Sequence, residues 1–591
     1  MPLAVRSLRA ALALGSVLAL LGVAHADAVA APRPFGHDCT PLSGVRFCPT
    51  RDDSERVPSF DGVPLDVDVT LPPSGDGPFP TIVMLHGWGG SKAMFESASA
   101  NSAYSNVALA SRGYAVVNYS ARGWGRSCGV PASRTAGCER GWTHLADQRY
   151  EIRDTQYLLG LLVDQGIADP RALGATGVSY GGIQSLELAF LRDRVRLRNG
   201  KLVRWRSPKG RLLTLRAAWA RWGTADLAGS LTLNGRISDA RRARVGASWE
   251  PLGIPKQSYI NGLYSLAAIS AYLAPPGADA TADLTTWKAI TDAARETPAA
   301  RSLVRELTRY HGAAGVADRR RAVAPLLIQN GWTDDLFPAI DGVYAYRLAG
   351  SGRRGFVALQ IGDLGHPRAQ TRLSEEGVFL RQGLAFFDRF LRGRRGGPGN
   401  GAVTAFLQSC PESTPSRPLR ARSWDSLARG RLILASRASG TVTSDGGDPT
   451  VGRTIDPIGG GGACAAVTPT KAPGTLVLER RVRRTTVVAG LPTISMRVRA
   501  SAGRAYVVAR LWSVGRDGKM RLIGRGAVRL RAKQRGAVRF QLLGTGWRLA
   551  AGDRVRLELL GRDAPYLRPN DEEGFKVHVS RVRALLPVVG R

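Results

Sequence analysis

Short apolar runs of the kind that form buried strands recur over the first two thirds of the chain, with helix-length stretches between them. The runs lie at 81–85, 172–176, 215–222, 326–330 and 356–361, and each consists mainly of apolar residues. Continuous apolar runs of about four to eight residues are typical of strands buried on both faces of a parallel sheet. Strands that alternate with helices define an α/β fold, so we predict an α/β sheet for this part of the chain.

The pattern changes twice further along. Between 223 and 321 the segments 264–273, 284–295 and 299–310 have a helical period and few strand formers, which predicts a helical insertion. A stretch rich in Gly and Arg at 392–401 indicates a linker. Beyond it, short runs alternate apolar and polar residues between Gly, Asp and Pro turns, a pattern that favours an all-β sandwich.

A nucleophile elbow is predicted at Gly177-Val178-Ser179-Tyr180-Gly181-Gly182, between an apolar run and a helix-forming stretch. In such an elbow a serine sits on a tight strand-to-helix turn, and small residues two before and two after it avoid a collision. The N–H of Tyr180 would lie at the positive end of the helix, where it can stabilise an oxyanion. Because a chain with 70 glycines produces this motif by chance, the prediction depends on the partners of Ser179.

An acid and a base follow Ser179 in the order Ser, Asp, His that a hydrolase sheet requires. Asp334 stands in the loop after the run 326–330, and His366 stands just past the run 356–361. About one strand-helix-strand unit separates the two, so neighbouring strands would bring their loops together. We assign Asp334 as the acid and His366 as the base, with Asp335 as the alternative acid.

The run 81–85 ends in His86-Gly87-Trp88-Gly89-Gly90, a glycine-rich turn after a predicted strand. An α/β hydrolase normally provides its second oxyanion donor at this position. We predict that Trp88 donates through its backbone N–H, that Gly87 and Gly89 allow close approach, and that His86 is structural.

Together these features resemble the X-prolyl dipeptidyl-peptidase and cocaine esterase family of serine hydrolases. The segment 119–129 resembles that family's Asp-x-Arg-Gly-x-Gly-x-Ser-x-Gly motif, with Ser120 where the family usually has Asp, and 386–393 resembles the helix that closes its catalytic domain. Trp88 stands where the family usually carries a tyrosine whose hydroxyl donates to the intermediate. The backbone N–H or the indole N–H of Trp88 would then replace that hydroxyl.

The resemblance covers most of residues 40 to 591 and implies an α/β-hydrolase sheet with an inserted helical cap, followed by a jelly-roll domain. The predicted organisation is a signal peptide at 1–26, the first part of the hydrolase domain at 27–222, the cap at 223–321, the second part of the hydrolase domain at 322–395, and the β-sandwich at 396–591.

The first residues have the composition of an export signal. Arg6 and Arg9 precede the apolar run 10–23, and the small-x-small sequence at 24–26 follows it. The alternative is a membrane anchor, but the run is shorter than the roughly 20 residues that span a bilayer. We therefore predict a secreted protein without stable membrane insertion.

The cysteines agree with export. There are six, in three pairs that are close in sequence, as expected for disulfides in an oxidising compartment. Although six cysteines allow fifteen pairings, proximity favours Cys39–Cys48, Cys128–Cys138 and Cys410–Cys464.

The formal net charge is +36. Weak attraction to an anionic cell-envelope polymer is one interpretation, but we favour a solvated arginine-rich surface, for example at Arg480, Arg481, Arg483 and Arg484. No zinc-finger, RNA-recognition or helix-turn-helix signature indicates nucleic acid, and no Cys-x-x-Cys or His-x-x-x-His spacing indicates a metal. We expect no cofactor and no metal, with a peptide or a small ester as substrate.

The resemblance implies two activities with one acyl-enzyme mechanism. Removal of an X-Pro dipeptide from a peptide amino terminus ranks slightly above cleavage of small acyl esters or amides. A non-catalytic envelope-binding protein is an alternative of another class, which the intact triad disfavours. Dipeptidyl release needs a carboxylate for the α-ammonium group. Candidates for this carboxylate are Asp239, Glu250 and Asp283, and candidate pocket aromatics are Trp249, Tyr259, Tyr264 and Trp287.

Overall fold

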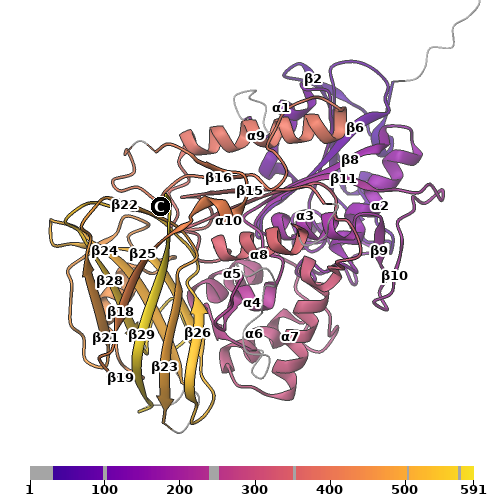
Figure 1. Cartoon of the computed structure of the whole chain (residues 1–591). Helices are drawn as coiled ribbons and strands as arrows, with labels where there is room; N and C mark the ends of the chain where they lie inside the picture. Colours follow the sequence, from indigo (N-terminus) through magenta and orange to yellow (C-terminus); the bar gives the residue numbers. More distant parts are fainter. Residues whose placement is uncertain are drawn as a thin grey trace, which may run out of the picture. The chain divides into compact units, whose positions relative to one another are not determined.

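The structure is a computed structural model that describes residues 31–96, 103–238, 252–350, 355–414, 416–501, 505–569 and 574–590. The predicted signal peptide at 1–26 lies outside the described residues, as do Asp239, Trp249 and Glu250. From Arg33 onward the chain forms one unit, in which an α/β part is followed by an all-β part (Figure 1). This arrangement confirms the predicted fold class.

One sheet of eleven strands organises the α/β part, in the order β1-β2-β5-β7-β6-β8-β11-β14-β15-β16-β17. Neighbours from β7 to β16 run parallel, while both edges of the sheet are antiparallel. The strands are β1 (Thr40–Leu42), β2 (Val45–Cys48), β5 (Val67–Leu71), β6 (Phe79–Leu85), β7 (Ala115–Tyr119), β8 (Ala168–Val178), β11 (Leu215–Arg221), β14 (Leu326–Gly331), β15 (Val357–Gly362), β16 (Val403–Ala405) and β17 (Leu419–Ala421).

Helices cover both faces of this sheet, which explains why the central strands read as continuous apolar runs. Helices α1 and α9 lie on one side, and α2, α3 and α8 lie on the other (Figure 1). Their bounds are α1 (Asn106–Ala110), α2 (Glu151–Asp164), α3 (Tyr180–Leu191), α8 (Ala339–Gly350) and α9 (Leu373–Arg392). On the α9 side, Trp219 of β11 packs in one core with Phe386 and Phe387.

The predicted helical insertion lies between β11 and β14. It contains α4 (Leu227–Leu231), α5 (Gln257–Ser270), α6 (Leu284–Ala293) and α7 (Pro298–Tyr310), with the short pair β12 (Thr232–Leu233) and β13 (Ile254–Pro255). Side chains cap three of these helices at their amino ends, because the first N–H groups of a helix have no internal acceptor. Asp226 caps α4, Asp283 caps α6 and Thr297 caps α7.

The all-β part consists of two sheets that enclose their own core. One has the order β26-β23-β29-β22-β27, with β18 and β19 also paired to β29, and the other has the order β20-β25-β24-β28-β21. The strands are β18 (Gly430–Ser436), β19 (Gly440–Thr443), β20 (Ala466–Val467), β21 (Leu476–Arg481), β22 (Thr486–Gly490), β23 (Thr493–Ala500), β24 (Tyr506–Val514), β25 (Met520–Arg529), β26 (Arg535–Gln541), β27 (Thr545–Leu549), β28 (Arg554–Leu560) and β29 (Lys576–Val588).

The structure differs from the boundary predicted at 396. Strand β16 pairs in parallel with β15, and β17 pairs with β16, so residues up to Ala421 extend the large sheet. These strands have three residues each, too few to show an alternating pattern. The first strand of the β sandwich is β18, which pairs with β29.

All three predicted disulfides are present. They join Cys39 to Cys48, Cys128 to Cys138, and Cys410 to Cys464. Within the described ranges, no helix has the length and apolar character needed to cross a membrane.

Limited trypsin digestion is expected to cut at Arg394 or Arg395. Both side chains are exposed, in the loop between α9 and β16, and exposed loops of this kind are preferred sites of proteolytic nicking. No disulfide spans the cut, so two fragments should separate on a denaturing gel, with boundaries read by amino-terminal sequencing. A digest without any boundary between residues 385 and 410 would contradict this prediction.

Candidate active site

Ser179 occupies the turn between β8 and α3 with φ 56° and ψ −113°. A non-glycine residue at positive φ is strained, and such strain is common at functional sites. The elbow forms because its neighbours are glycines: a Cβ on Gly177 would lie 2.5 Å from the carbonyl oxygen of Leu85, and a Cβ on Gly181 would lie 2.0 Å from it. These close approaches explain the small residues of the motif.

The three residues predicted as a triad lie in one hydrogen-bonded chain. The Nε2 atom of His366 is 2.7 Å from Ser179 Oγ, and its Nδ1 atom is 2.8 Å from Asp334 Oδ2. The other carboxylate oxygen of Asp334 accepts the backbone N–H groups of Leu336 and Phe337, both at 2.9 Å. Asp334 is fully buried, so these bonds hold its carboxylate in a fixed orientation toward the imidazole.

Asp335, the alternative acid, points elsewhere. Its carboxylate forms ion pairs with Arg368 and Arg525. Burial alone would raise the pKa of Asp335, but the two guanidinium groups lower it to about 2. The geometry therefore supports Asp334 as the partner of His366.

Tyr180 N–H belongs to the first residue of α3, so it has no acceptor within the helix. The Tyr180 side chain is buried and donates its hydroxyl to Glu151 Oε1 at 3.1 Å. Glu151 also accepts the backbone N–H of His144 at 2.7 Å, and burial raises the pKa of Glu151 to about 7. Sequence reasoning missed Glu151, because a carboxylate at the start of a helix is usually a surface residue.

Trp88 lies beside Tyr180, with ring centroids 5.3 Å apart. Its indole N–H donates to the carbonyl oxygen of Leu263 at 3.0 Å. Because the indole is engaged by α5, the suggestion that it serves as an oxyanion donor does not fit this arrangement. The backbone N–H of Trp88 remains the second predicted donor.

His86, interpreted from the sequence as a structural residue, makes two hydrogen bonds with the backbone. Its Nδ1 donates to the carbonyl oxygen of Gly87 at 2.8 Å, and its Nε2 accepts the backbone N–H of Ala121 at 2.9 Å. The ring thus ties the glycine-rich turn to the loop after β7. Burial lowers the pKa of His86 to about 4.

Acid is expected to destabilise the protein through His86. The folded pKa of about 4 lies below the ordinary value of 6.5, so between these values the unfolded chain binds a proton that the folded chain does not. This contribution is fully present above pH 6.5 and is lost as the pH falls toward 4, by up to about 3 kcal/mol.

Denaturant unfolding of the wild type, His86→Gln and His578→Gln between pH 4 and pH 7.5 measures this effect. The free energy of unfolding of His86→Gln should depend less on pH than that of the wild type. His578 is exposed, so its variant should follow the wild type. If the free energy of unfolding changes with pH equally in His86→Gln and the wild type, His86 is not the source of the pH dependence.

A pocket with a volume of about 130 Å³ opens beside Ser179. Its walls are almost entirely aliphatic and aromatic, and most of them come from the helical insertion. The lining residues are Trp88, Leu145, Ser179, Tyr180, Ile183, Leu227, Ala228, Leu231, Thr232, Leu252, Ile260, Leu263, Tyr264, Leu284, Trp287, Lys288, Thr291, Leu303, Val304, Leu307, Leu336 and Phe337.

Two of the predicted pocket aromatics, Tyr264 and Trp287, line this pocket. Tyr259 does not: it is buried, and its hydroxyl donates to the carbonyl oxygen of Pro367 at 2.7 Å. The aliphatic lining was not predicted, because leucines spaced along four helices carry no local sign that they face one cavity.

No carboxylate occurs among the described residues that line the pocket. Asp283, one of the candidate ammonium partners, instead accepts the backbone N–H groups of Gly277 and Thr286. The charged lining residue Lys288 is paired with Asp292. The described walls therefore offer apolar contacts and no anionic partner for a substrate ammonium group.

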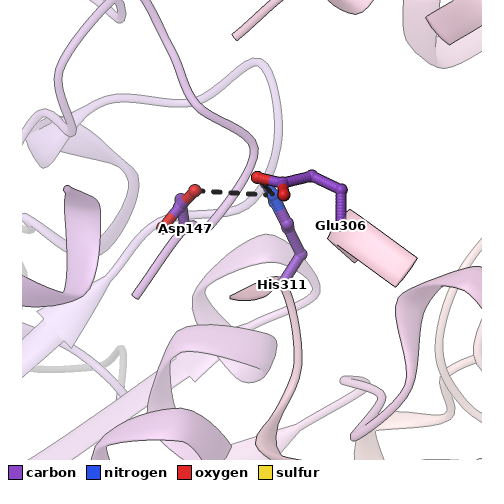
Figure 2. Close-up of side chains that lie close together, drawn as sticks. All are labelled: Asp147, Glu306 and His311. Atoms are coloured by element: carbon purple, nitrogen blue, oxygen red, sulfur yellow. Dashed lines mark ion pairs between the residues drawn. The ribbon is translucent and has the colours of Figure 1, made fainter. Parts of the chain in front are cut away.

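Asp147, Glu306 and His311 gather where the end of α7 meets the loop before α2 (Figure 2). His311 Nε2 lies 3.5 Å from Asp147 and 3.9 Å from Glu306. Although burial opposes a charged imidazole, these carboxylates raise the pKa of His311. Carboxylates and imidazole are metal-ligand types, but the guanidinium of Arg149 already donates to both carboxylates. We interpret the group as an ion-pair network that holds α7 in place.

A serine elbow at the carboxyl end of a parallel strand, with histidine and aspartate in hydrogen-bond reach, is the arrangement of the α/β hydrolases. Comparison with protein families agrees. The model of the X-Pro dipeptidyl-peptidase (S15 family) matches residues 61–195, and the model of the X-Pro dipeptidyl-peptidase C-terminal non-catalytic domain matches residues 479–582. Comparison with curated proteins gives no match.

Solved structures share the fold over nearly the whole chain. An aminopeptidase from the marine sediment archaeon Thaumarchaeota archaeon has a TM-score of 0.60 at 14% identity, covering 93% of this chain and 98% of that chain. A CocE/NonD family hydrolase from Staphylococcus aureus has a TM-score of 0.59 at 13% identity, covering 97% and 99%. An α-amino acid ester hydrolase has a TM-score of 0.56 at 14% identity, covering 93% and 98%. At such identities the likeness shows the fold alone.

The chain is therefore a hydrolase with an α/β-hydrolase fold. The resemblance to the X-prolyl dipeptidyl-peptidase and cocaine esterase family of hydrolases, inferred from the sequence, is confirmed by the two matched regions.

Proposed function

We propose that this protein is a secreted serine hydrolase that acts through an acyl-enzyme. Ser179 Oγ attacks a substrate carbonyl while His366 Nε2 accepts the hydroxyl proton. Asp334 holds the imidazole in the tautomer with the proton on Nδ1 and stabilises the imidazolium that forms. The backbone N–H groups of Tyr180 and Trp88 bind the oxyanion. The chain of hydrogen bonds from Ser179 to Asp334 carries this proposal.

The second half of the reaction uses the same groups in reverse. His366 returns the proton to the leaving group, which departs as an alcohol or an amine. Water then attacks the acyl-enzyme carbonyl, with His366 accepting its proton, and Ser179 leaves with a proton from the imidazolium. Both halves need the short contact between His366 and Ser179.

The three disulfides support export, because such bonds persist in oxidising compartments and are rare in the cytosol. The predicted signal peptide at 1–26 gives the route. Mass spectrometry of the protein from the culture medium should find an amino terminus after residue 26, and retention of the full chain inside the cell would contradict secretion.

For the substrate, the lining of the pocket favours an ester with an apolar acyl group. Aliphatic and aromatic walls stabilise such a group by burial, whereas a free α-ammonium would lack an anionic partner among the described lining residues. This reverses the slight preference that the sequence gave to peptides. X-Pro dipeptidyl release remains the second candidate because both matched family models describe X-Pro dipeptidyl-peptidases.

Labelling with a fluorophosphonate tests the mechanism. The wild type should be modified at one residue, Ser179, and Ser179→Ala should take up no label. Equal labelling of the two proteins would refute the proposal.

Comparison of substrates tests the specificity. We expect kcat/KM for aryl esters to rise with the length of the acyl chain from acetyl to hexanoyl, because each added methylene is buried in the pocket. An Ala-Pro anilide should react slowly, with a free or a blocked amino terminus. Faster cleavage of the free anilide than of any ester would establish the dipeptidyl-peptidase instead.

A non-catalytic role at the cell envelope predicts a different result. Arg480, Arg481, Arg483 and Arg484 are exposed, as the solvated-surface interpretation requires. Retention on an anionic wall polymer that disappears at high salt, without turnover of any ester, would support the binding protein.

A further inference from the structure

Asp335 joins the loop that carries the acid to the loop that carries the base. It follows Asp334 directly, and its carboxylate accepts hydrogen bonds from Nε and Nη2 of Arg368. Arg368 stands two residues after His366. The ion pair therefore ties together the two loops whose spacing sets the contact between His366 and Asp334.

The β sandwich holds Asp335 from the other side. Arg525 of β25 donates through Nη2 to the Asp335 carboxylate, across 190 residues of sequence. Tyr566, also in the β sandwich, donates its hydroxyl to the backbone carbonyl oxygen of Asp335 at 3.0 Å. The guanidinium of Arg525 lies 3.6 Å above the ring of Tyr566. Side chain and main chain of Asp335 are thus both fixed by the C-terminal part.

These groups are withdrawn from water. The side chains of Asp335, Arg368 and Arg525 are exposed by 3% or less. A buried carboxylate is stable only when it is paired, and removal of one partner leaves charge that the interior cannot solvate. Loss of Arg525 would therefore act on Asp335 first, and through it on the two loops.

We propose that Arg525 is a positioning residue for catalysis, through which the β sandwich holds the acid and base loops at their working distance. The proposal rests on the function proposed above for Ser179, His366 and Asp334. It assigns a role in catalysis to a domain whose family description is non-catalytic, although Arg525 itself contacts no reacting atom.

Arg510 provides a matched control. It lies on β24, is exposed by 2%, and pairs with Asp563, which also faces Arg525. Among the described residues, the side-chain hydrogen bonds of Arg510 go to Asp563, and none reaches the loop of Asp334 or that of His366. Arg510→Met thus removes a buried guanidinium from the same network of the β sandwich without touching Asp335.

We expect Arg525→Met to lower kcat about 100-fold, since a displacement of about 1 Å in a catalytic group has an effect of this size. KM for the aryl ester should change less than threefold, because the pocket walls come mainly from the helical insertion. The rate of fluorophosphonate labelling should fall with kcat. Arg510→Met should lose about as much Tm as Arg525→Met but keep kcat within about threefold of the wild type. Arg525→Lys should recover part of the kcat that Arg525→Met loses.

If Arg525→Met and Arg510→Met lose kcat equally, each in proportion to its loss of Tm, the inference is overturned and the contact of Arg525 with Asp335 is only a structural ion pair. If Arg525→Met does not fold, Tyr566→Phe is the variant that tests the inference, because it removes only the hydroxyl bonded to Asp335. Tyr566→Phe should lower kcat while its Tm stays near that of the wild type. An unchanged kcat would overturn the inference. Absence of labelling in the wild type would instead refute the proposed function.

Discussion

Asp334→Asn is expected to lower kcat about 10⁴-fold near neutral pH while the protein stays folded. The asparagine oxygen can keep the hydrogen bonds to the N–H groups of Leu336 and Phe337, as Oδ1 does now. The amide NH₂ would then face His366 in place of Oδ2. Two donors cannot face each other, so the imidazole would present Nε2–H to Ser179 and lose its ability to accept the proton.

Steady-state kinetics with an aryl ester and thermal unfolding measure this prediction. Asp363→Asn is the matched control: Asp363 is buried in the base loop and accepts from Thr333 and Gln370, with no contact to the imidazole. Its kcat should stay within about tenfold of the wild type. A kcat of Asp334→Asn above that of Asp363→Asn would rule out Asp334 as the partner of the base.

Gly181→Ala is expected to cost more than about 4 kcal/mol of folding free energy, a size reserved for severe steric conflicts. The added Cβ would lie 2.0 Å from the backbone oxygen of Leu85, which ends β6. Neither backbone can move without separating α3 from the sheet. The glycine-rich turn that follows Leu85 would shift as well, so fluorophosphonate labelling should disappear in any folded fraction.

Gly262→Ala is the control for this substitution. Gly262 lies on the exposed side of α5, and a Cβ there meets nothing within 4 Å. Because alanine is the better helix former, this variant should gain about 0.5 to 1 kcal/mol. Similar unfolding curves for the two variants would show that the contact with Leu85 is not tight.

The triad could be predicted from sequence because each member stands within a few residues of the end of a strand whose apolar run can be recognised from the sequence alone. Ser179 is recognised by the neighbouring glycines that the tight turn requires. Asp334 and His366 follow apolar runs that form neighbouring strands of the sheet, so their loops lie close together. The sequence does not distinguish Asp334 from Asp335 as the acid, because adjacent carboxylates have the same local pattern. The structure distinguishes the two carboxylates, because Asp335 is paired with Arg368 and Arg525 whereas Asp334 faces His366.

The remaining features depend on contacts that no local pattern records. Arg525 contacts Asp335 from a strand 190 residues away in sequence. From the sequence alone, an arginine in a strand of alternating apolar and polar residues is predicted to face solvent. The walls of the pocket converge from separate helices. The predicted boundary at 396 assigns the residues of β16 and β17 to the β sandwich, because three residues carry too little periodicity to show a strand.

The segment between β11 and β14 supplies most of the pocket walls, while Ser179, Asp334 and His366 all lie outside it. The proposed function therefore assigns acyl preference and bond cleavage to separate stretches of the gene. Recombination that exchanges this one segment between relatives would pass on a new acyl preference as a single heritable block. The exchange would have to retain Lys256 and Tyr259, whose bonds to Leu336 and Pro367 hold the acid and base loops. Substrate range in this lineage can therefore diverge without any change in the triad.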